Sequence, residues 1–161
     1  MISKLDEIFK IKNDDDFTSE LFRFIQRDEK SFSIHKLNRH ERTIILIISG
    51  QGIIDNGGFQ YFFCNNFKEP PDYNWFTQAY NDIGAIECAK AFQEFLDLFP
   101  NSKPQFDIEI RRKFMKNKIK PEKNEKIQRL ESLFFSKSHE NYSKLAIYSR
   151  KNKEYFFKEI N

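Results

Sequence analysis

Residues 85–99 constrain the fold of this chain more than any other segment. When the segment is drawn as a helix, its polar residues gather on about a third of the circumference and apolar residues cover the rest. A helix that is apolar over so wide an arc contacts neighbours on several sides, so we expect it at the centre of the molecule. Gly84 and Pro100 bracket the segment and mark the two ends of this helix.

Helical spacing also dominates the apolar residues elsewhere in the chain. The stripes are Phe17, Leu21, Phe24 and Ile25; Phe106, Ile110 and Phe114; Ile127, Leu130 and Phe134; and Tyr142, Leu145 and Ala146. Such stripes are typical of helices packed on a core. The chain of 161 residues has the length of one domain. We therefore expect an all-α fold, a single compact multi-helix domain with a central apolar helix.

The stretch 44–63 supports two interpretations. Residues 44–48 are rich in β-branched side chains, and residues 55–58 followed by 59–63 could form a hairpin. In the helical alternative, Asn38 caps a buried helix over residues 44–54, whose two glycines allow a neighbour to approach closely. The spacing favours the helix, but so short an apolar run does not decide between the two.

The overall net charge of +3 hides an uneven distribution along the chain. Residues 41–100 hold 3 basic and 8 acidic groups, whereas residues 101–161 hold 16 basic and 8 acidic groups. The basic excess is densest over residues 111–126, whose eight Lys and Arg could attract phosphates. Phe114 is the one aromatic residue there that could stack on a base, so a solvated helix end is the alternative interpretation.

No residues in the sequence have the spacing of a catalytic or metal-binding set. His35, His40 and His139 lack a companion at ligand spacing, and Cys64 and Cys88 stand among apolar residues as small core side chains. The sequence contains neither a nucleophile elbow nor a phosphate-binding loop. We therefore expect a chain that is not an enzyme and that uses no metal and no cofactor.

The sequence also lacks the signals that direct a chain to a membrane or out of the cell. Its N-terminus has no continuous apolar region of the secretory kind. The longest strongly apolar stretch, residues 43–54, is shorter than the about 20 residues that a bilayer span needs. We expect a cytoplasmic protein with reduced thiols and no membrane contact.

Three blocks stand in a specific order in the middle of the chain. They are Asn56-Gly57-Gly58-Phe59-Gln60-Tyr61-Phe62-Phe63-Cys64-Asn65, then Ile83-Gly84-Ala85, then Leu98-Phe99-Pro100. Together they resemble a bacterial domain family named after DNA-mimic protein nineteen. The resemblance covers residues 37–157 and implies an all-helical single domain, which tips residues 44–63 toward the helical interpretation. Residues 1–36 would then be an N-terminal helical extension, and residues 158–161 a tail.

The first block can be explained as a structural motif. Glycines at 57 and 58 tolerate positive φ, so one helix can end there and a second can leave sharply. Phe59 and the phenylalanines after it would face the interior, and Asn65 could bond backbone groups at the next break. The alternative is a small-molecule or enzymatic site built around Asn56, Gln60 and Asn65.

The resemblance also bears on function. The founding member of the family is similar to duplex DNA in its surface charge and, as an acidic dimer, occupies the DNA-binding face of a transcription factor. This chain departs from that pattern because its net charge is positive and its acidic surplus between residues 41 and 100 is small. We expect a non-enzymatic protein-interaction domain that regulates a protein partner such as a transcription factor or a toxin, and a homodimer is compatible with this.

The expected partner surface combines acidic and aromatic residues, the latter in a loop at 70–75 that we expect to be exposed. The candidate residues are Asp55, Glu69, Asp72, Tyr73, Trp75 and Asp82. A plain alternative is that Trp75 and Phe76 cover the core. The other function that the sequence leaves open is nucleic-acid binding by residues 111–126.

Overall fold

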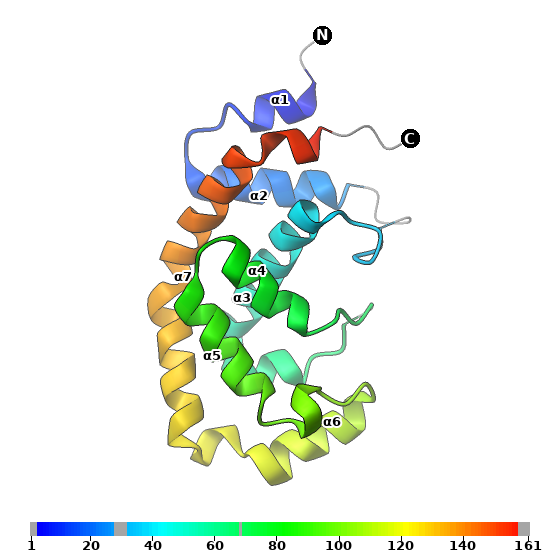
Figure 1. Cartoon of the computed structure of the whole chain (residues 1–161), viewed down its shortest axis with the longest axis vertical. Coiled ribbons are helices and arrows are strands. Elements are labelled where there is room, and N and C mark those ends of the chain that lie inside the picture. Colours follow the sequence, from blue (N-terminus) through cyan, green and yellow to red (C-terminus); the bar gives the residue numbers. More distant parts are fainter. Residues whose placement is uncertain (1–2, 28–31, 68, 158–161) are drawn as a thin grey trace.

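The computed structural model describes residues 3–27, 32–67 and 69–157 and shows an all-α single domain (Figure 1). Within these ranges the chain forms seven α-helices and no strand, which confirms the expected fold class. The helices are α1 (Lys4–Ile8), α2 (Asp14–Ile25), α3 (Arg39–Phe63), α4 (Asn74–Asp82), α5 (Ile86–Leu96), α6 (Ile108–Phe114) and α7 (Glu125–Lys151). A π-helical turn, Met115–Ile119, extends α6, and short 3₁₀ turns lie at Pro100–Ser102, Pro121–Lys123 and Lys153–Phe156. No helix in the described part of the chain is both long and apolar enough to cross a bilayer.

α7 runs along one edge of the molecule and connects its two poles (Figure 1). α3 contacts α2, α4 and α7, while α5 contacts α4 and α7. α1 and the 3₁₀ turn at Lys153–Phe156 lie at one pole, and α6 lies at the opposite pole (Figure 1). The two apolar stripes predicted between residues 127 and 146 therefore belong to one continuous helix.

α5 is the central apolar helix that its composition predicts. Its buried side chains are Cys88, Ala89, Ala91, Phe92, Phe95 and Leu96. The ring centroid of Phe95 lies 4.4 Å from that of Phe59 and 4.8 Å from that of Phe63, both near the end of α3. Phe134 of α7 meets Phe59 edge to face at 5.1 Å. Such pairs add about 0.5–1.5 kcal/mol each beyond the burial of their surface, so the cluster fastens α3, α5 and α7 together.

The ambiguous stretch 44–63 is helical. Asn38 caps α3, because its side-chain oxygen accepts the N–H groups of His40 (2.9 Å) and Glu41 (3.0 Å) and its own N–H donates to the Glu41 carboxylate. A Cβ at Gly50 would lie 2.8 Å from a ring carbon of Phe76 in α4, so the predicted close approach is confirmed there. The same prediction is wrong at Gly52, because no atom lies within 4 Å of the position that a Cβ would occupy there.

A buried polar network sets the register between α3, α4 and α7. The side-chain oxygen of Gln51 accepts the Tyr80 hydroxyl (3.1 Å) and the Asn141 amide (3.0 Å). The Gln51 amide nitrogen donates to Asp55 at 2.8 Å, and Asp55 also accepts the Ser138 hydroxyl at 2.5 Å. Gln51, Tyr80 and Asn141 are almost fully buried, so a slip of one helix past another would leave polar groups without partners.

The segment before residue 37 packs against the rest of the molecule. Phe17 and Leu21 of α2 are completely buried. Arg150 of α7 donates to the Asp14 carboxylate at 2.5 Å and to the Ile11 carbonyl at 3.2 Å, and its guanidinium lies 4.4 Å from the Phe17 ring centroid. The N-terminal helices thus share one core with α3 and α7. The predicted tail, residues 158–161, lies outside the described residues.

Candidate functional site

The asparagine and glycine motif forms a bend inside α3. Gly57 (φ −167°, ψ 20°) and Gly58 (φ 67°, ψ −168°) leave the helical conformation, and the helix resumes at Phe59 in a new direction. The carboxylate of Glu131, from α7, accepts the Phe59 N–H at 2.8 Å. A Cβ at Gly58 would lie 2.3 Å from that carboxylate oxygen, so the missing side chain makes room for the acid.

Glu131 therefore acts as a cap for the second half of α3. Burial raises the pKa of its carboxyl, and the N–H groups of Phe59 and Gln60 oppose part of that rise. A carboxylate at this position satisfies N–H groups that have no partner within the helix. The predicted positive φ is confirmed at Gly58, whereas Gly57 has an extended φ of −167°. The carboxylate that caps the bend lies on another helix, where sequence spacing does not reveal it.

The remaining motif amides do not converge on a deep cavity. Asn56 is exposed and donates to the Gly52 carbonyl at 2.6 Å, while the exposed Gln60 shares a shallow, open depression with it. Asn65 lies outside that depression, and its carbonyl accepts from Arg111 at 3.1 Å. The structure thus brings Asn56 and Gln60 together and leaves Asn65 apart.

The acidic residues predicted for a partner surface make contacts within the chain. Asp82, at the end of α4, accepts two hydrogen bonds from Arg39 (2.9 and 2.6 Å). Asp55 is exposed and accepts from the buried Gln51 and from Ser138. Glu69 accepts the Ser33 hydroxyl at 2.7 Å, and this bond lowers the pKa of its carboxyl. Each of these carboxylates connects two elements of the fold.

The loop at 70–75 is only partly exposed. Tyr73 is buried among aromatic rings, so its predicted exposure is wrong. Trp75 is half-buried, with the Arg42 guanidinium 4.0 Å from its ring and His35 meeting it edge on at 5.2 Å. Asp72 is exposed, and its carboxylate accepts the N–H of Asn74 at 2.9 Å. The backbone turns here because α4 begins, and that turn carries Tyr73 inward.

A groove that the sequence does not reveal lies between the segment before α4 and the segment before α6. We call it the α4–α6 groove. It has a volume of about 350 Å³. Its lining residues are Pro70, Pro71, Asp72, Tyr73 and Asn74 on one side and Ser102, Lys103, Pro104, Phe106 and Arg111 on the other. Two loops far apart in the sequence form it, which is why no local pattern predicts it.

The rim of the α4–α6 groove carries the most exposed aromatic side chain among the described residues. Phe106 is 84% exposed and Ile110 is 57% exposed, so the prediction that these two face the core is wrong. They lie four residues apart, and Phe114 of the same stripe is half-buried against Phe99, with 5.5 Å between ring centroids. α6 begins only after Asp107 has capped it, which leaves Phe106 in the preceding loop and turned to solvent.

Arg111 takes the inward position on α6 instead. It is 4% exposed, and its guanidinium donates to the carbonyls of Phe63 (2.6 Å), Gln105 (2.6 Å) and Asn65 (3.1 Å). These carbonyls belong to the end of α3 and to the loop before α6. Arg111, which lines the groove, therefore joins the loop before α6 to the end of α3.

Two buried polar atoms next to the groove have no hydrogen-bond partner among the described residues. They are the hydroxyl of Tyr73 and the side-chain oxygen of Gln105. Burial also raises the pKa of the Tyr73 hydroxyl, which stays protonated at neutral pH. A buried polar group without a partner costs about 1–3 kcal/mol, so this wall holds unused hydrogen-bonding capacity.

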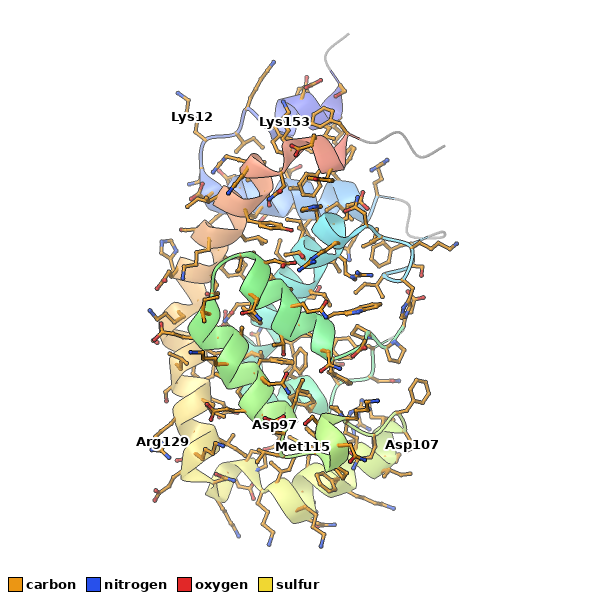
Figure 2. All side chains as sticks on the ribbon, in the orientation of Figure 1. Lys12, Asp97, Asp107, Met115, Arg129 and Lys153 are labelled. Atoms are coloured by element: carbon orange, nitrogen blue, oxygen red, sulfur yellow. The ribbon has the colours of Figure 1, made fainter. Side chains whose placement is uncertain are left out.

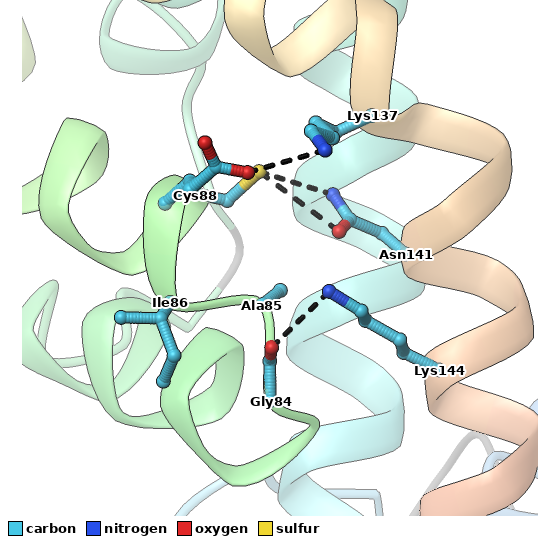
Figure 3. A pocket seen from close by; sticks show the side chains of 8 residues that line it. Gly84, Ala85, Ile86, Cys88, Lys137, Asn141 and Lys144 are labelled. Atoms are coloured by element: carbon cyan, nitrogen blue, oxygen red, sulfur yellow. Dashed lines mark hydrogen bonds and ion pairs between the residues drawn. The ribbon is translucent and has the colours of Figure 1, made fainter.

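A smaller cleft of about 220 Å³ lies between the amino end of α5 and α7 (Figure 3). Cys88 and Asn141 meet at its base, with 3.3 Å between the thiol sulfur and the amide nitrogen. Lys137 pairs with Glu87 at 3.1 Å, and Lys144 donates to a backbone carbonyl (Figure 3). Burial raises the pKa of the Cys88 thiol, which therefore stays protonated and unreactive near neutral pH. The cations of this cleft already have partners in the chain.

The basic segment 111–126 lies at the pole of the molecule opposite α1 (Figure 1). Figure 2 places Asp107 and Met115, which flank α6, at that pole and Lys153 at the other. Arg112 pairs with Glu109 at 2.8 Å, whereas the lysines at 113, 116, 118, 120 and 123 are exposed and form no ion pair with a described residue.

Across residues 3–27, 32–67 and 69–157, no three His, Cys, Asp or Glu side chains are grouped so that they could hold a metal ion.

Comparison with known protein families places the chain in context. A search of curated proteins finds no match to this chain. A search of solved structures likewise finds none. The model of the family described as DMP19-like protein matches residues 35–152, which include the bend of α3, the central helix α5 and most of α7. The chain therefore belongs to the DMP19-like protein family.

Proposed function

We propose that this chain is a non-enzymatic protein-interaction domain and that it contacts its partner at the α4–α6 groove. The observation that carries the proposal is Phe106, whose ring is 84% exposed at the groove in a chain that buries nine of its largest aromatic side chains almost completely. Exposed aromatic side chains beside a pocket are typical of protein-binding hot spots. Ile110 extends the apolar surface along α6.

The titratable groups support a binding role over a catalytic one. Burial raises the pKa of both cysteine thiols, which disfavours the thiolate that a nucleophile needs. Glu131, the carboxyl whose pKa burial raises, caps the second half of α3 and is not part of the α4–α6 groove.

The family resemblance suggests that the partner is a regulatory protein, such as a transcription factor or a toxin. A DNA-like acidic array is not the means of binding that we propose, because all eight carboxylates between residues 41 and 100 make hydrogen bonds or ion pairs within the chain. The proposal places the chain in the cytoplasm of a bacterium, where free thiols such as Cys64 and Cys88 stay reduced.

The test is affinity capture of partners from the native host with the tagged full chain. Phe106→Ser should lose the partner, because it removes the exposed ring without disturbing the core. Phe135→Ser is the matched control, since Phe135 is also exposed but lies on α7, outside the groove. Equal recovery by the two variants would refute the groove as the contact site.

Nucleic-acid binding is the second candidate, and the exposed lysines after Arg112 favour it. Their ammonium groups form no ion pair with a described residue and so remain available for phosphates. A gel shift at low salt tests it, with replacement of Lys116 and Lys118 by glutamate as the comparison. This function requires a complex whose affinity falls steeply with salt, and the absence of a complex at about 10 μM protein would remove it.

A further inference from the structure

We infer that the α4–α6 groove binds a short acidic segment of a partner protein and seats one large apolar side chain of that segment. This inference rests on the proposed function and names the chemistry of the partner. Four features of the groove carry it: its size and walls, its charge, its unsatisfied hydroxyl and the aliphatic part of its rim.

The groove has the size and walls of a pocket for one side chain. Its volume of about 350 Å³ has room for a leucine or an aromatic ring but is at the small end for a drug-sized ligand. Pro70, Pro71 and Pro104 supply rigid walls that lose little conformational entropy on binding, and Phe106 supplies an exposed ring to close over the guest.

The charge around the groove selects an acidic guest. Residues 100–124 hold eight Lys or Arg and three Asp or Glu. Lys103 lines the groove and Lys113 lies one turn beyond Ile110 on α6, and neither forms an ion pair with a described residue. Asp72, the one carboxylate of the wall, already accepts the N–H of Asn74. Carboxylates on either side of the apolar side chain would therefore meet unpaired ammonium groups.

The hydroxyl of Tyr73 offers a hydrogen bond that the free chain does not use. Tyr73 lines the groove, is 8% exposed, and its hydroxyl has no partner among the described residues. The opposite wall includes Ser102, which has a left-handed φ of 55° that is unfavourable for serine. A partner that displaces this strained wall slightly can offer a backbone carbonyl to the Tyr73 hydroxyl.

The shape of the rim favours a protein segment over a nucleic acid. Phe106 could stack on a base, but Ile110, four residues along the chain and also exposed, presents an aliphatic surface that base stacking does not use. An exposed aromatic side chain before α6 and an exposed aliphatic side chain in its first turn suit the apolar side chains of a short peptide.

The experiment selects ligands without assuming a sequence. A phage library of random 12-residue peptides is panned on the immobilised full chain, with depletion on the Phe106→Ser variant. We expect the enriched peptides to carry a leucine or an aromatic residue flanked by Asp and Glu. The best peptide is labelled with fluorescein, and its dissociation constant is measured by anisotropy against the wild type and the variants.

Each variant has its own expected result. Phe106→Ser should weaken binding at least about tenfold, and Phe135→Ser should leave it unchanged. The double change Lys103→Glu and Lys113→Glu should weaken binding and reduce its salt dependence. Tyr73→Phe should weaken binding about fivefold yet raise the melting temperature of the free chain, because it removes an unsatisfied buried hydroxyl. A purely structural role for Tyr73 would change only the melting temperature.

Other outcomes would overturn the inference. Enriched peptides that are basic, or no enrichment over the Phe106→Ser variant, contradict an acidic segment. Fluorescein-labelled oligothymidine that binds the wild type and loses affinity in Phe106→Ser would assign the groove to single-stranded nucleic acid instead. If host partners still depend on Phe106 while the selected peptides are not acidic, the inference fails and the proposed function stands. If neither capture nor panning depends on Phe106, both fail.

Discussion

Gly58 holds the bend of α3 in a conformation that glycine alone adopts readily. Because an added Cβ would also meet the Glu131 carboxylate at 2.3 Å, we expect Gly58→Ala to lower the free energy of unfolding by about 2–4 kcal/mol in urea denaturation. Gly52→Ala is the matched control. It has open space around its Cβ site and should gain about 0.5–1 kcal/mol. Equal stability of Gly58→Ala and the wild type would contradict the structural explanation of the motif.

Glu131 makes the stability of the same bend depend on pH. Its pKa is raised in the folded chain, chiefly by burial, so the folded state binds the proton more tightly than the unfolded state. Its favourable contribution is therefore complete below its ordinary pKa of 4.5 and is lost as the pH rises through the raised value. Relative to Glu131→Gln, we expect the wild type to gain unfolding free energy as the pH falls from about 7 to about 4. Chemical denaturation between these pH values measures the difference in unfolding free energy. A wild type that loses stability as the pH falls would show that the N–H groups affect the pKa of Glu131 more than burial does.

At the scale of elements, α6 is held by one buried cation. The Arg111 guanidinium donates to four carbonyls at once, at the end of α3 and in the loop before α6. A lysine carries a single ammonium group and cannot reproduce that geometry. We expect Arg111→Lys to lower the unfolding free energy by about 2–4 kcal/mol, whereas Arg112→Lys, on the exposed side of α6, should change it by less than about 0.5 kcal/mol. Thermal unfolding of the two variants compares them, and similar losses would argue against a special role for Arg111.

α6 also shows why the fold was easier to predict from sequence than the site. Apolar spacing identifies α2, α5 and α7, because their stripes do face the core. The stripe of Phe106, Ile110 and Phe114 has the same spacing, yet Arg111 occupies the inward position, since carbonyls at the end of α3 need a donor. That need arises from tertiary packing. The α4–α6 groove likewise depends on two loops that meet only in the folded chain.

At the scale of the whole molecule, the family match and the folding unit do not coincide. The match begins at residue 35, but the core that it contains is completed by Phe17 and Leu21 of α2, which lies outside it. Arg150 of α7 bonds to Asp14 and to the Ile11 carbonyl, so the last long helix is fastened to the first residues of the fold. Meanwhile α6 and the basic segment that follows it lie at the far pole (Figure 1), and the loop before α6 forms one side of the groove. The N-terminal helices therefore contribute to the shared core, although they lie outside the family match.

The single tryptophan, Trp75, allows a test of whether the N-terminal helices unfold together with the rest of the domain. Trp75 lies in α4, whereas Phe17 lies in α2 and is completely buried against α7 and its neighbours. We expect Phe17→Ala to lower the unfolding free energy by about 3–5 kcal/mol and to shift the transitions seen by Trp75 fluorescence and by far-ultraviolet CD to the same extent. Phe135→Ala, a truncation of an exposed ring, should move both transitions by much less. If α1 and α2 were a separable extension, Phe17→Ala would leave the Trp75 transition in place and alter only part of the CD signal, because α4 would unfold independently of them.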